Sequence, residues 1–228
     1  MTPPPPAGPP SPDPGPAPIV LVHGTATTPA IWTDVAALLR TAGHEVSTPE
    51  RPRSGDLATE LAWLQDQARD AWLVGVSGGA TLGLAAAGAG LRLRGAVLHE
   101  PAVGSLVPDL LAPVAAAFAD GGTVALGAAL YGPAWDCEPG PASDDVVTAR
   151  ELAMFRGFEP VPLPATVGPV LVTVGGDSPP VRHAAAAAAA GLGATTRVLP
   201  GVAHHVARTH PAQFAAVVAD WVSGRSRG

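Results

Sequence analysis

The 228-residue sequence contains no lysine, because all thirteen of its basic residues are arginine. The absence of lysine excludes Schiff-base catalysis and the phosphate-binding lysine of a Walker loop. A single cysteine, Cys137, excludes an internal disulfide and offers no zinc-binding pattern. The formal net charge is −6 and the arginines are scattered, so nothing favours binding to nucleic acid. We expect no bound metal, no cofactor and no nucleic-acid partner.

Membrane-spanning and secretory segments are also missing from the sequence. No apolar run is long enough to cross a bilayer, so we expect no membrane contact. Residues 1–18 are rich in proline and lack the basic start and apolar centre of a secretory signal. We interpret residues 1–18 as a disordered, polyproline-II-like tail and expect a cytoplasmic protein. The sequence does not predict an oligomeric state.

The rest of the chain, residues 19–228, has the pattern of one folded domain. Short apolar runs alternate with helical segments, which predicts a parallel sheet joined by right-handed crossovers. We therefore expect an α/β fold with about six parallel strands and helices on both faces. The predicted strands cover residues 19–22, 44–48, 71–76, 95–98, 170–174 and 195–199. The predicted helices begin near residues 29, 56, 78, 179 and 211.

The alternation of strands and helices stops between residues 102 and 166. Helix-like patterns at 106–119 and 143–155 surround a stretch rich in glycine and proline. We interpret residues 102–166 as a small helical cap over the carboxyl ends of the strands. The apolar side chains of the cap would either line a hydrophobic substrate pocket or pack the cap onto the sheet.

The sequence G-x-S-x-G occurs where the apolar strand at 71–76 meets a helix. Its fixed positions are Gly75, Ser77 and Gly79. Small neighbours allow the strand and the helix to cross closely and leave the serine exposed at a sharp turn. The amino end of the helix would also favour a negative charge that develops beside the serine. This pattern predicts that Ser77 is a nucleophile.

Side chains that suit acyl-transfer chemistry follow several of the predicted strands. They are His23, Ser77, Glu100, Asp177 and His204. The carboxyl ends of parallel strands meet at one edge of a sheet, so we expect these side chains to converge. A serine nucleophile needs a histidine base, and the base needs a carboxylate that holds its tautomer. The order serine, acid, histidine along the chain is typical of nucleophile-elbow hydrolases.

The chain resembles the α/β-hydrolase fold family over residues 19–222. This resemblance implies a reduced version of the fold, which lacks the first two antiparallel strands of larger members and keeps six parallel strands. It also implies that the insertion at 102–166 is the cap of the family. The motifs that carry the resemblance are V-H-G-T at 22–25, G-V-S-G-G at 75–79, H-E-P at 99–101, G-G-D-S-P at 175–179 and P-G-V-A-H at 200–204.

The resemblance implies a role for most of these motif residues. Ser77 would be the nucleophile and His204 the general base, with His205 as the rival base. The backbone N–H groups of Thr25 and Gly78 would form the oxyanion hole. His23 would be structural, and the loop before His204 has alanine where the family usually has glycine.

Two residues remain candidates for the triad acid. Asp177 follows the strand on which many family members carry the acid, and we favour it slightly. However, the common spacing G-x-x-D, counted from Gly175, places the acid at Ser178, so Asp177 comes one residue early. Glu100 follows the preceding strand, where other family members place their acid.

These residues together predict a serine hydrolase. We expect it to cleave a carboxylic ester, thioester or lactone of a small apolar substrate through an acyl-enzyme. The alternative is a non-hydrolytic member of the same fold, either a ligand sensor or a biosynthetic cyclase. A dinucleotide-binding domain is disfavoured, because the glycines at 75, 78, 79 and 83 do not form G-x-G-x-x-G.

Overall fold

The computed structural model describes residues 17–132, 135 and 141–224. Of the predicted tail at 1–18, residues 1–16 lie outside the described residues. Cys137 lies outside them as well.

The structure confirms the predicted sheet of six parallel strands. The strands lie in the order β2-β1-β3-β4-β5-β6. Their register places Val22 beside Gly75 and Val76 beside His99. The strands are β1 (Ile19–Val22), β2 (Val46–Ser47), β3 (Trp72–Val76), β4 (Gly95–His99), β5 (Val170–Gly175) and β6 (Thr195–Leu199).

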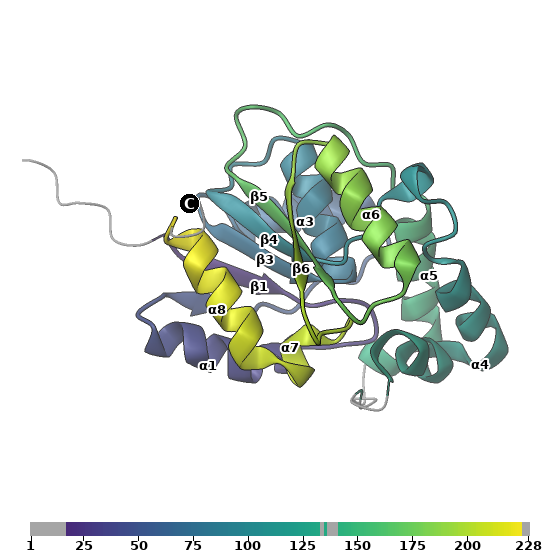
Figure 1. Ribbon diagram of the computed structural model, residues 1–228. Coiled ribbons are helices and arrows are strands. Elements are labelled where there is room, and N and C mark those ends of the chain that lie inside the picture. Colours follow the sequence, from purple (N-terminus) through teal and green to yellow (C-terminus); the bar gives the residue numbers. More distant parts are fainter. Residues whose placement is uncertain (1–16, 133–134, 136–140, 225–228) are drawn as a thin grey trace, which may run out of the picture.

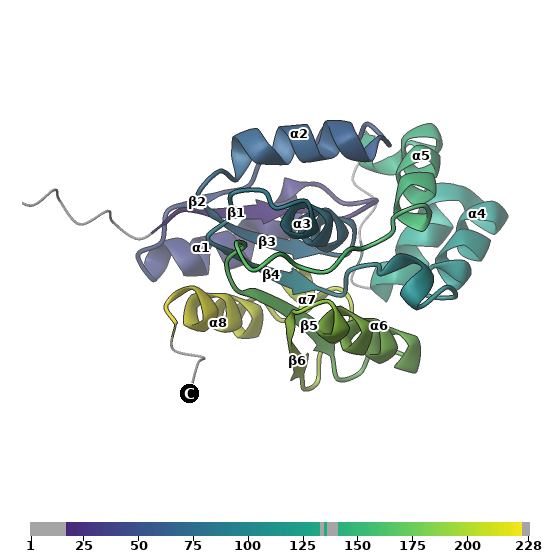
Figure 2. The same ribbon diagram turned by 90° about the horizontal axis from the view of Figure 1, so that it is seen from above.

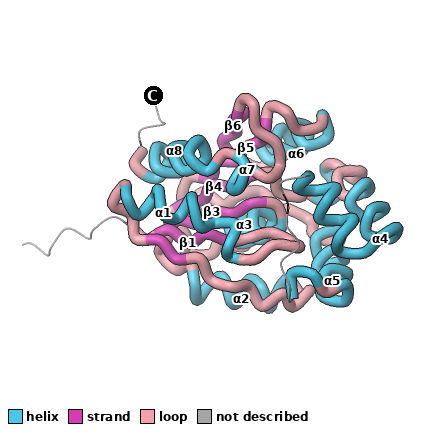
Figure 3. Tube along the Cα trace, turned by 90° about the horizontal axis from the view of Figure 1, so that it is seen from below, coloured by secondary structure: helices cyan, strands magenta, loops and turns pink. Residues whose placement is uncertain are grey.

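Helices cover both faces of this sheet (Figures 1 and 3). One core cluster joins the sheet to α1 and α8, where Trp32 stacks on Phe214 with ring centroids 6.2 Å apart. The other core cluster joins the opposite face to α2, α3 and α6. The helices are α1 (Thr33–Thr41), α2 (Leu57–Gln67), α3 (Gly78–Gly88), α6 (Pro180–Gly191), α7 (Val206–Thr209) and α8 (Pro211–Val222).

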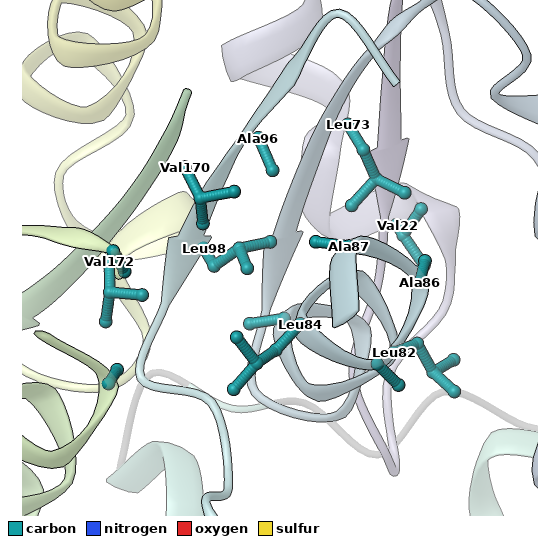
Figure 4. Packing of buried hydrophobic residues seen from close by; sticks show 14 of the residues in the cluster. Val22, Leu73, Leu82, Leu84, Ala86, Ala87, Ala96, Leu98, Val170 and Val172 are labelled. Atoms are coloured by element: carbon teal, nitrogen blue, oxygen red, sulfur yellow. The ribbon is translucent and has the colours of Figure 1, made fainter. Parts of the chain in front are cut away.

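Helix α3 is surrounded by protein, and its residues 78–87 are all buried. Figure 4 shows Leu82 and Leu84 of this helix among side chains from the strands, including Leu73 and Leu98. A helix that is apolar on every side is stable only inside a core. The core therefore fixes the position of the turn that precedes α3.

The sequence located the helix starts well because they carry local signals. The Thr28 hydroxyl accepts a hydrogen bond from the N–H of Ala30 at 3.2 Å, and a 3-10 helix (Pro29–Trp32) begins there before α1. Asp56 accepts from the N–H of Thr59 at 2.8 Å and begins α2. Helix α7 has only four residues and was not predicted.

Residues 102–166 hold α4 (Ala112–Tyr131) and α5 (Asp145–Arg156), which stand together at one end of the molecule (Figures 1 and 2). Two 3-10 helices, Gly104–Leu106 and Pro141–Ser143, lie in the same region. The predicted helix at 106–119 is shifted, because α4 begins six residues later, beside Pro113, and continues to Tyr131.

Helix α4 corrects one expectation from the sequence. By length and composition alone, its 20 residues could cross a membrane, although we expected no stretch of that kind. However, Gly121 and Gly122 have non-helical backbone angles and break α4 in its middle. Helix α4 therefore consists of two shorter helices that meet at a kink.

Candidate active site

Ser77 occupies a sharp turn between β3 and α3. Its backbone angles are φ 54° and ψ −122°, a conformation that is strained for a residue with a side chain. A Cβ atom on Gly79 would lie 2.1 Å from the carbonyl oxygen of Val22, and one on Gly75 would lie 2.5 Å from the backbone of Gly79. Only glycine fits at these two positions, so the predicted close crossing of strand and helix is present.

Glu100 follows β4 and is 2% exposed. Its backbone, like that of Ser77, is in the left-handed region, with φ 52°. The carboxylate accepts three hydrogen bonds: Oε1 accepts from the N–H of Gly175 at 2.9 Å and from the hydroxyl of Ser178 at 2.5 Å. The third comes from Nδ1 of His204, which lies 2.6 Å from Oε2. Glu100 and His204 therefore form a buried carboxylate–imidazole pair.

A second histidine, His99, holds the loop that carries His204 through a hydrogen bond to its backbone. Nε2 of His99, at the end of β4, donates to the carbonyl oxygen of Ala203 at 3.3 Å. Nδ1 of His99 lies 2.9 Å from the hydroxyl of Thr173 on β5. Burial lowers the pKa of His99, so this imidazole remains neutral and serves as a hydrogen-bonding strut.

The slight preference for Asp177 as the acid does not fit this geometry. The side chain of Asp177 is exposed, whereas Glu100 lies buried against His204. The position that the family spacing gives to the acid, Ser178, instead donates a hydrogen bond to Glu100. His204 makes the 2.6 Å contact with Glu100, and the ring of the rival base, His205, lies 4.8 Å from that of Tyr131.

Tyr131, the last residue of α4, connects the cap to Ser77 and His204. Its hydroxyl donates to the carbonyl oxygen of Thr25 at 2.6 Å. Burial raises the pKa of Tyr131 to about 12, although a hydrogen bond with the Ser77 side chain opposes this rise. The Tyr131 ring also stacks on His204, with centroids 5.6 Å apart. The Ser77 hydroxyl thus contacts Tyr131, and Nε2 of His204 makes no hydrogen bond to any residue that the structure describes.

The turn after β1 has four successive carbonyl groups that each accept a hydrogen bond from a side chain. The carbonyl of Thr25 is held by Tyr131, and that of Ala26 by the indole N–H of Trp135 at 2.9 Å. Arg51 donates to the carbonyl of Gly24 at 3.4 Å, and Arg53 donates to that of Thr27. We call residues 24–27 the oxyanion turn, after the role that the sequence predicts for Thr25, which lines the same cavity as Ser77 and Gly78.

The charges around His204 keep its ring neutral. Burial and then the positive charge of Arg182 lower the pKa of His204 to about 4, although the hydrogen bond to Glu100 opposes them. Burial raises the pKa of Glu100, but the hydrogen bond and charge of His204 outweigh it and hold this pKa below its usual range. At neutral pH the pair therefore consists of an imidazole, protonated on Nδ1, and a carboxylate. The buried Nε2, which has no hydrogen-bond partner among the described residues, can accept a proton.

Comparison with protein families settles which family the chain belongs to. A family model described as the alpha/beta hydrolase family matches residues 19–217. The chain belongs to this family. Among curated proteins, none is significantly similar to the chain.

Solved structures of other alpha/beta hydrolases share the fold at low sequence identity. A carboxylesterase from Nitrososphaera gargenis has a TM-score of 0.69 and 15% identity, over 94% of this chain and 93% of its own. The enol-lactonase from Burkholderia xenovorans has a TM-score of 0.67 and 21% identity, over 92% of both chains. An alpha/beta hydrolase from Sphaerobacter thermophilus has a TM-score of 0.59 and 23% identity, over 90% of this chain and 92% of its own.

Ser77 of this alpha/beta hydrolase lines a cavity of about 30 Å³. The walls of the cavity are mainly apolar, and the cap supplies much of the lining. The cap residues that line it are Leu111, Val114, Leu126, Leu130, Leu152 and Phe155. Leu111 and Phe155 also pack against the core on the α3 face, so cap side chains both line the cavity and pack onto the core. His204 lines a second and wider cavity, of about 460 Å³.

A buried ionic cluster joins α5 of the cap to α2 and to the loop that follows β2. Arg51 pairs with Glu60 of α2 at 3.4 Å and, more closely, with Glu151 of α5. Arg53 lies 3.7 Å from the same Glu151. We call these residues, Arg51, Arg53, Glu60 and Glu151, the cap-joint cluster. The carboxylate of Glu151 steadies two arginines that hold the oxyanion turn.

Several residues of the site were not identified from the sequence. The clearest available signal was Ser178, because a serine at the usual acid position indicates that the acid lies elsewhere. Tyr131 and Arg182 reach the site from helices that carry no local motif, so only the fold reveals them. Among the described residues, no group of three His, Cys, Asp or Glu side chains could hold a metal ion.

Proposed function

We propose that this alpha/beta hydrolase is a serine esterase in which Ser77, His204 and Glu100 form the catalytic triad. The observation that carries the proposal is the 2.6 Å hydrogen bond between His204 and Glu100 beside the strained Ser77 turn. Glu100 takes the role of the acid in place of Asp177. Its three hydrogen-bond donors keep it ionised, and an ionised acid stabilises the imidazolium that forms during the reaction.

In the proposed reaction, the Ser77 hydroxyl attacks the carbonyl carbon of the substrate. Nε2 of His204 takes the hydroxyl proton and later delivers it to the leaving alcohol or thiol. The backbone N–H groups of Thr25 and Gly78 stabilise the negative oxygen of the tetrahedral intermediate. Water, activated by His204, then attacks the acyl-enzyme and releases the acid.

The site requires one rearrangement before this reaction. The Ser77 hydroxyl contacts Tyr131, and it must turn to His204 to lose its proton. The Ser77 side chain rotates in a tight space, because a Cβ atom placed on Gly24 would lie 2.9 Å from both the Ser77 Cβ and the Tyr131 hydroxyl. Catalytic hydrogen bonds are often formed only in the substrate complex. We infer that substrate binding completes the contact between Ser77 and His204.

The apolar cavity beside Ser77 favours a small substrate with an apolar acyl part. A carboxylic ester, a thioester or a lactone would react by the steps above. The fold shared with a carboxylesterase and an enol-lactonase fits this range of substrates.

The direct test is covalent labelling of Ser77 with a fluorophosphonate probe. We expect one adduct on the wild-type chain, located at Ser77 by peptide mass spectrometry. The adduct should disappear in Ser77→Ala and persist in Ser223→Ala, which removes an exposed serine at the end of α8. Circular dichroism would show that each variant is folded. A folded wild-type chain that is not labelled would refute the proposed mechanism.

One observation favours a second candidate, a non-hydrolytic ligand sensor or cyclase. Tyr131 engages the Ser77 hydroxyl, and Nε2 of His204 makes no hydrogen bond to any described residue. Hydrolysis of short p-nitrophenyl esters separates the two candidates. Turnover that depends on Ser77 supports the esterase, and labelling without turnover supports the second candidate.

A further inference from the structure

Arg182 of α6 is a buried cation that faces the proposed active site. Its side chain is 9% exposed, although arginine is normally a surface residue. Arg182 lines the cavity that contains Ser77 and also the wider cavity that contains His204. Arg182 therefore borders the space beside Ser77 and His204.

The contacts of Arg182 with the protein use only part of its hydrogen-bonding capacity. A guanidinium carries five N–H donors. Among the described residues, Nη1 of Arg182 donates to the carbonyl oxygen of Glu100 at 3.4 Å, and Nε lies 3.6 Å from Oε2 of the same residue. The Glu100 carboxylate already accepts from Gly175, Ser178 and His204 at 2.9 Å or less. Arg182 therefore lacks a close carboxylate partner of its own.

This arrangement has a cost for the proposed chemistry. The positive charge of Arg182 is the second cause, after burial, that lowers the pKa of His204. A weaker base removes the Ser77 proton less readily. A negative group bound to Arg182 would offset that charge and restore the basicity of His204. The remaining lining of the Ser77 cavity is mainly apolar, and Glu100 supplies its only negative charge among the described lining residues.

We propose that Arg182 binds a carboxylate of the substrate, so that the preferred substrates are half-esters of dicarboxylic acids. This inference rests on the proposed esterase function and specifies its substrate class. The ester carbonyl of such a molecule lies at Ser77 and its free carboxylate on the guanidinium. The chain between them packs on Val114 and Leu130, which line both cavities beside Arg182.

Hydrolysis of matched ester pairs tests the proposal. The pairs are the monomethyl and dimethyl esters of succinate, adipate and suberate, followed in a pH-stat. For at least one chain length, we expect the wild-type kcat/KM for the half-ester to exceed that for the diester. A hydrogen-bonded charge pair gives roughly a ten- to hundredfold preference. A preference for the diester at every chain length would overturn the proposal.

Variants at Arg182 show whether this preference comes from the guanidinium. Arg182→Gln should reduce the half-ester to diester ratio by at least about tenfold. Arg182→Lys should keep part of it, because the charge remains but the planar fork is lost. The control, Arg208→Gln, removes an exposed arginine of α7 and should leave the ratio unchanged. Equal losses on both esters in Arg182→Gln would mean that Arg182 only positions Glu100, and the proposal would fail.

A binding measurement separates this inference from the esterase proposal. Calorimetry with Ser77→Ala should detect monomethyl adipate but not dimethyl adipate at the same concentration. The binding heat of monomethyl adipate should vanish in the double variant that carries both Ser77→Ala and Arg182→Gln. If the wild type hydrolyses neither ester but this binding pattern holds, the esterase proposal fails and the carboxylate site stands. If Arg182→Gln does not fold, the wild-type ester ratio and Arg182→Lys still decide the question.

Discussion

Two buried arginines near the nucleophile, Arg51 and Arg182, differ in how their charge is balanced. Arg51 pairs with two buried carboxylates, those of Glu60 and Glu151, and donates to the oxyanion turn. Arg182 shares the Glu100 carboxylate with His204: Nε of Arg182 lies 3.6 Å from Oε2, whereas Nδ1 of His204 lies 2.6 Å from the same atom. Both side chains are out of water, where an unbalanced charge is costly.

The difference indicates what each arginine does. A buried cation with its own carboxylates is part of the framework, and here it fastens α5 of the cap to α2. A buried cation that shares its carboxylate with another residue, and that lines a cavity, has hydrogen-bond donors left for a ligand. The comparison therefore assigns the cap-joint cluster to structure and Arg182 to recognition, although both lie close to Ser77.

The strongest test of this comparison removes the carboxylate that Arg182 shares. Glu100→Gln should lower kcat by about 10³- to 10⁴-fold, because the amide cannot stabilise the His204 imidazolium. Asp177→Asn, on an exposed side chain, should change kcat by less than about threefold. Steady-state kinetics on one p-nitrophenyl ester would measure both. The reverse ranking would return the acid to Asp177.

The next test breaks the cap-joint cluster. Glu151→Gln should lower the free energy of unfolding by about 3–5 kcal/mol, because Arg51 and Arg53 keep their charges without this partner. Chemical denaturation would measure the loss. Asp66→Asn, on an exposed face of α2, is the matched control and should stay within about 0.5 kcal/mol of the wild type. An equally small effect of Glu151→Gln would show that this cluster does not stabilise the fold.

A smaller effect is expected at Tyr131, on which the charges of Arg51 and Arg182 both act. Tyr131→Phe leaves the buried carbonyl of Thr25 without its 2.6 Å donor, which costs about 1–3 kcal/mol of unfolding free energy. The variant also frees the Ser77 hydroxyl from Tyr131. The denaturant midpoint would report the stability change. An unchanged midpoint would mean that water replaces the phenol without loss.

The smallest effect is expected in the pH dependence. The pKa of His204 is about 4, so wild-type kcat/KM for a neutral ester should stay level as the pH falls toward 4. Below that pH, the protonated imidazole can no longer accept the Ser77 proton. Removing the Arg182 charge removes one cause of the low pKa, so Arg182→Gln should move this acid limb upward, by about one unit or less.

The charged and titratable groups that face His204 set the direction of that shift. Glu100 raises the pKa of His204, whereas Arg182 and His99 lower it. Tyr131 and His205 stay in place in Arg182→Gln. The control is Arg182→Lys, which keeps the positive charge and should keep the limb near pH 4. A limb that moves downward in Arg182→Gln would contradict the assigned electrostatics.

The sequence predicted those parts of the molecule that depend on neighbouring residues. Apolar runs marked the six strands, Thr28 and Asp56 marked helix starts, and glycines marked the Ser77 turn. The acid could not be chosen this way, because Glu100 and Asp177 both follow strands and only the folded loops decide which reaches His204. Tyr131 reaches Ser77 from the far end of a kinked helix, and no local pattern encodes that path.

The oxyanion turn depends on the cap for two of its side-chain donors, Tyr131 and Trp135. A version of this protein shortened by deleting residues 112–156 would therefore keep Ser77, His204 and Glu100 but lose the bracing of Thr25 and Ala26. Replacing this segment with that of a relative, in order to change the substrate range, would also remove the hydrogen bonds to Thr25 and Ala26. Any redesign of the residues that line the binding cavity must therefore keep Tyr131 and Trp135 as hydrogen-bond donors to the oxyanion turn.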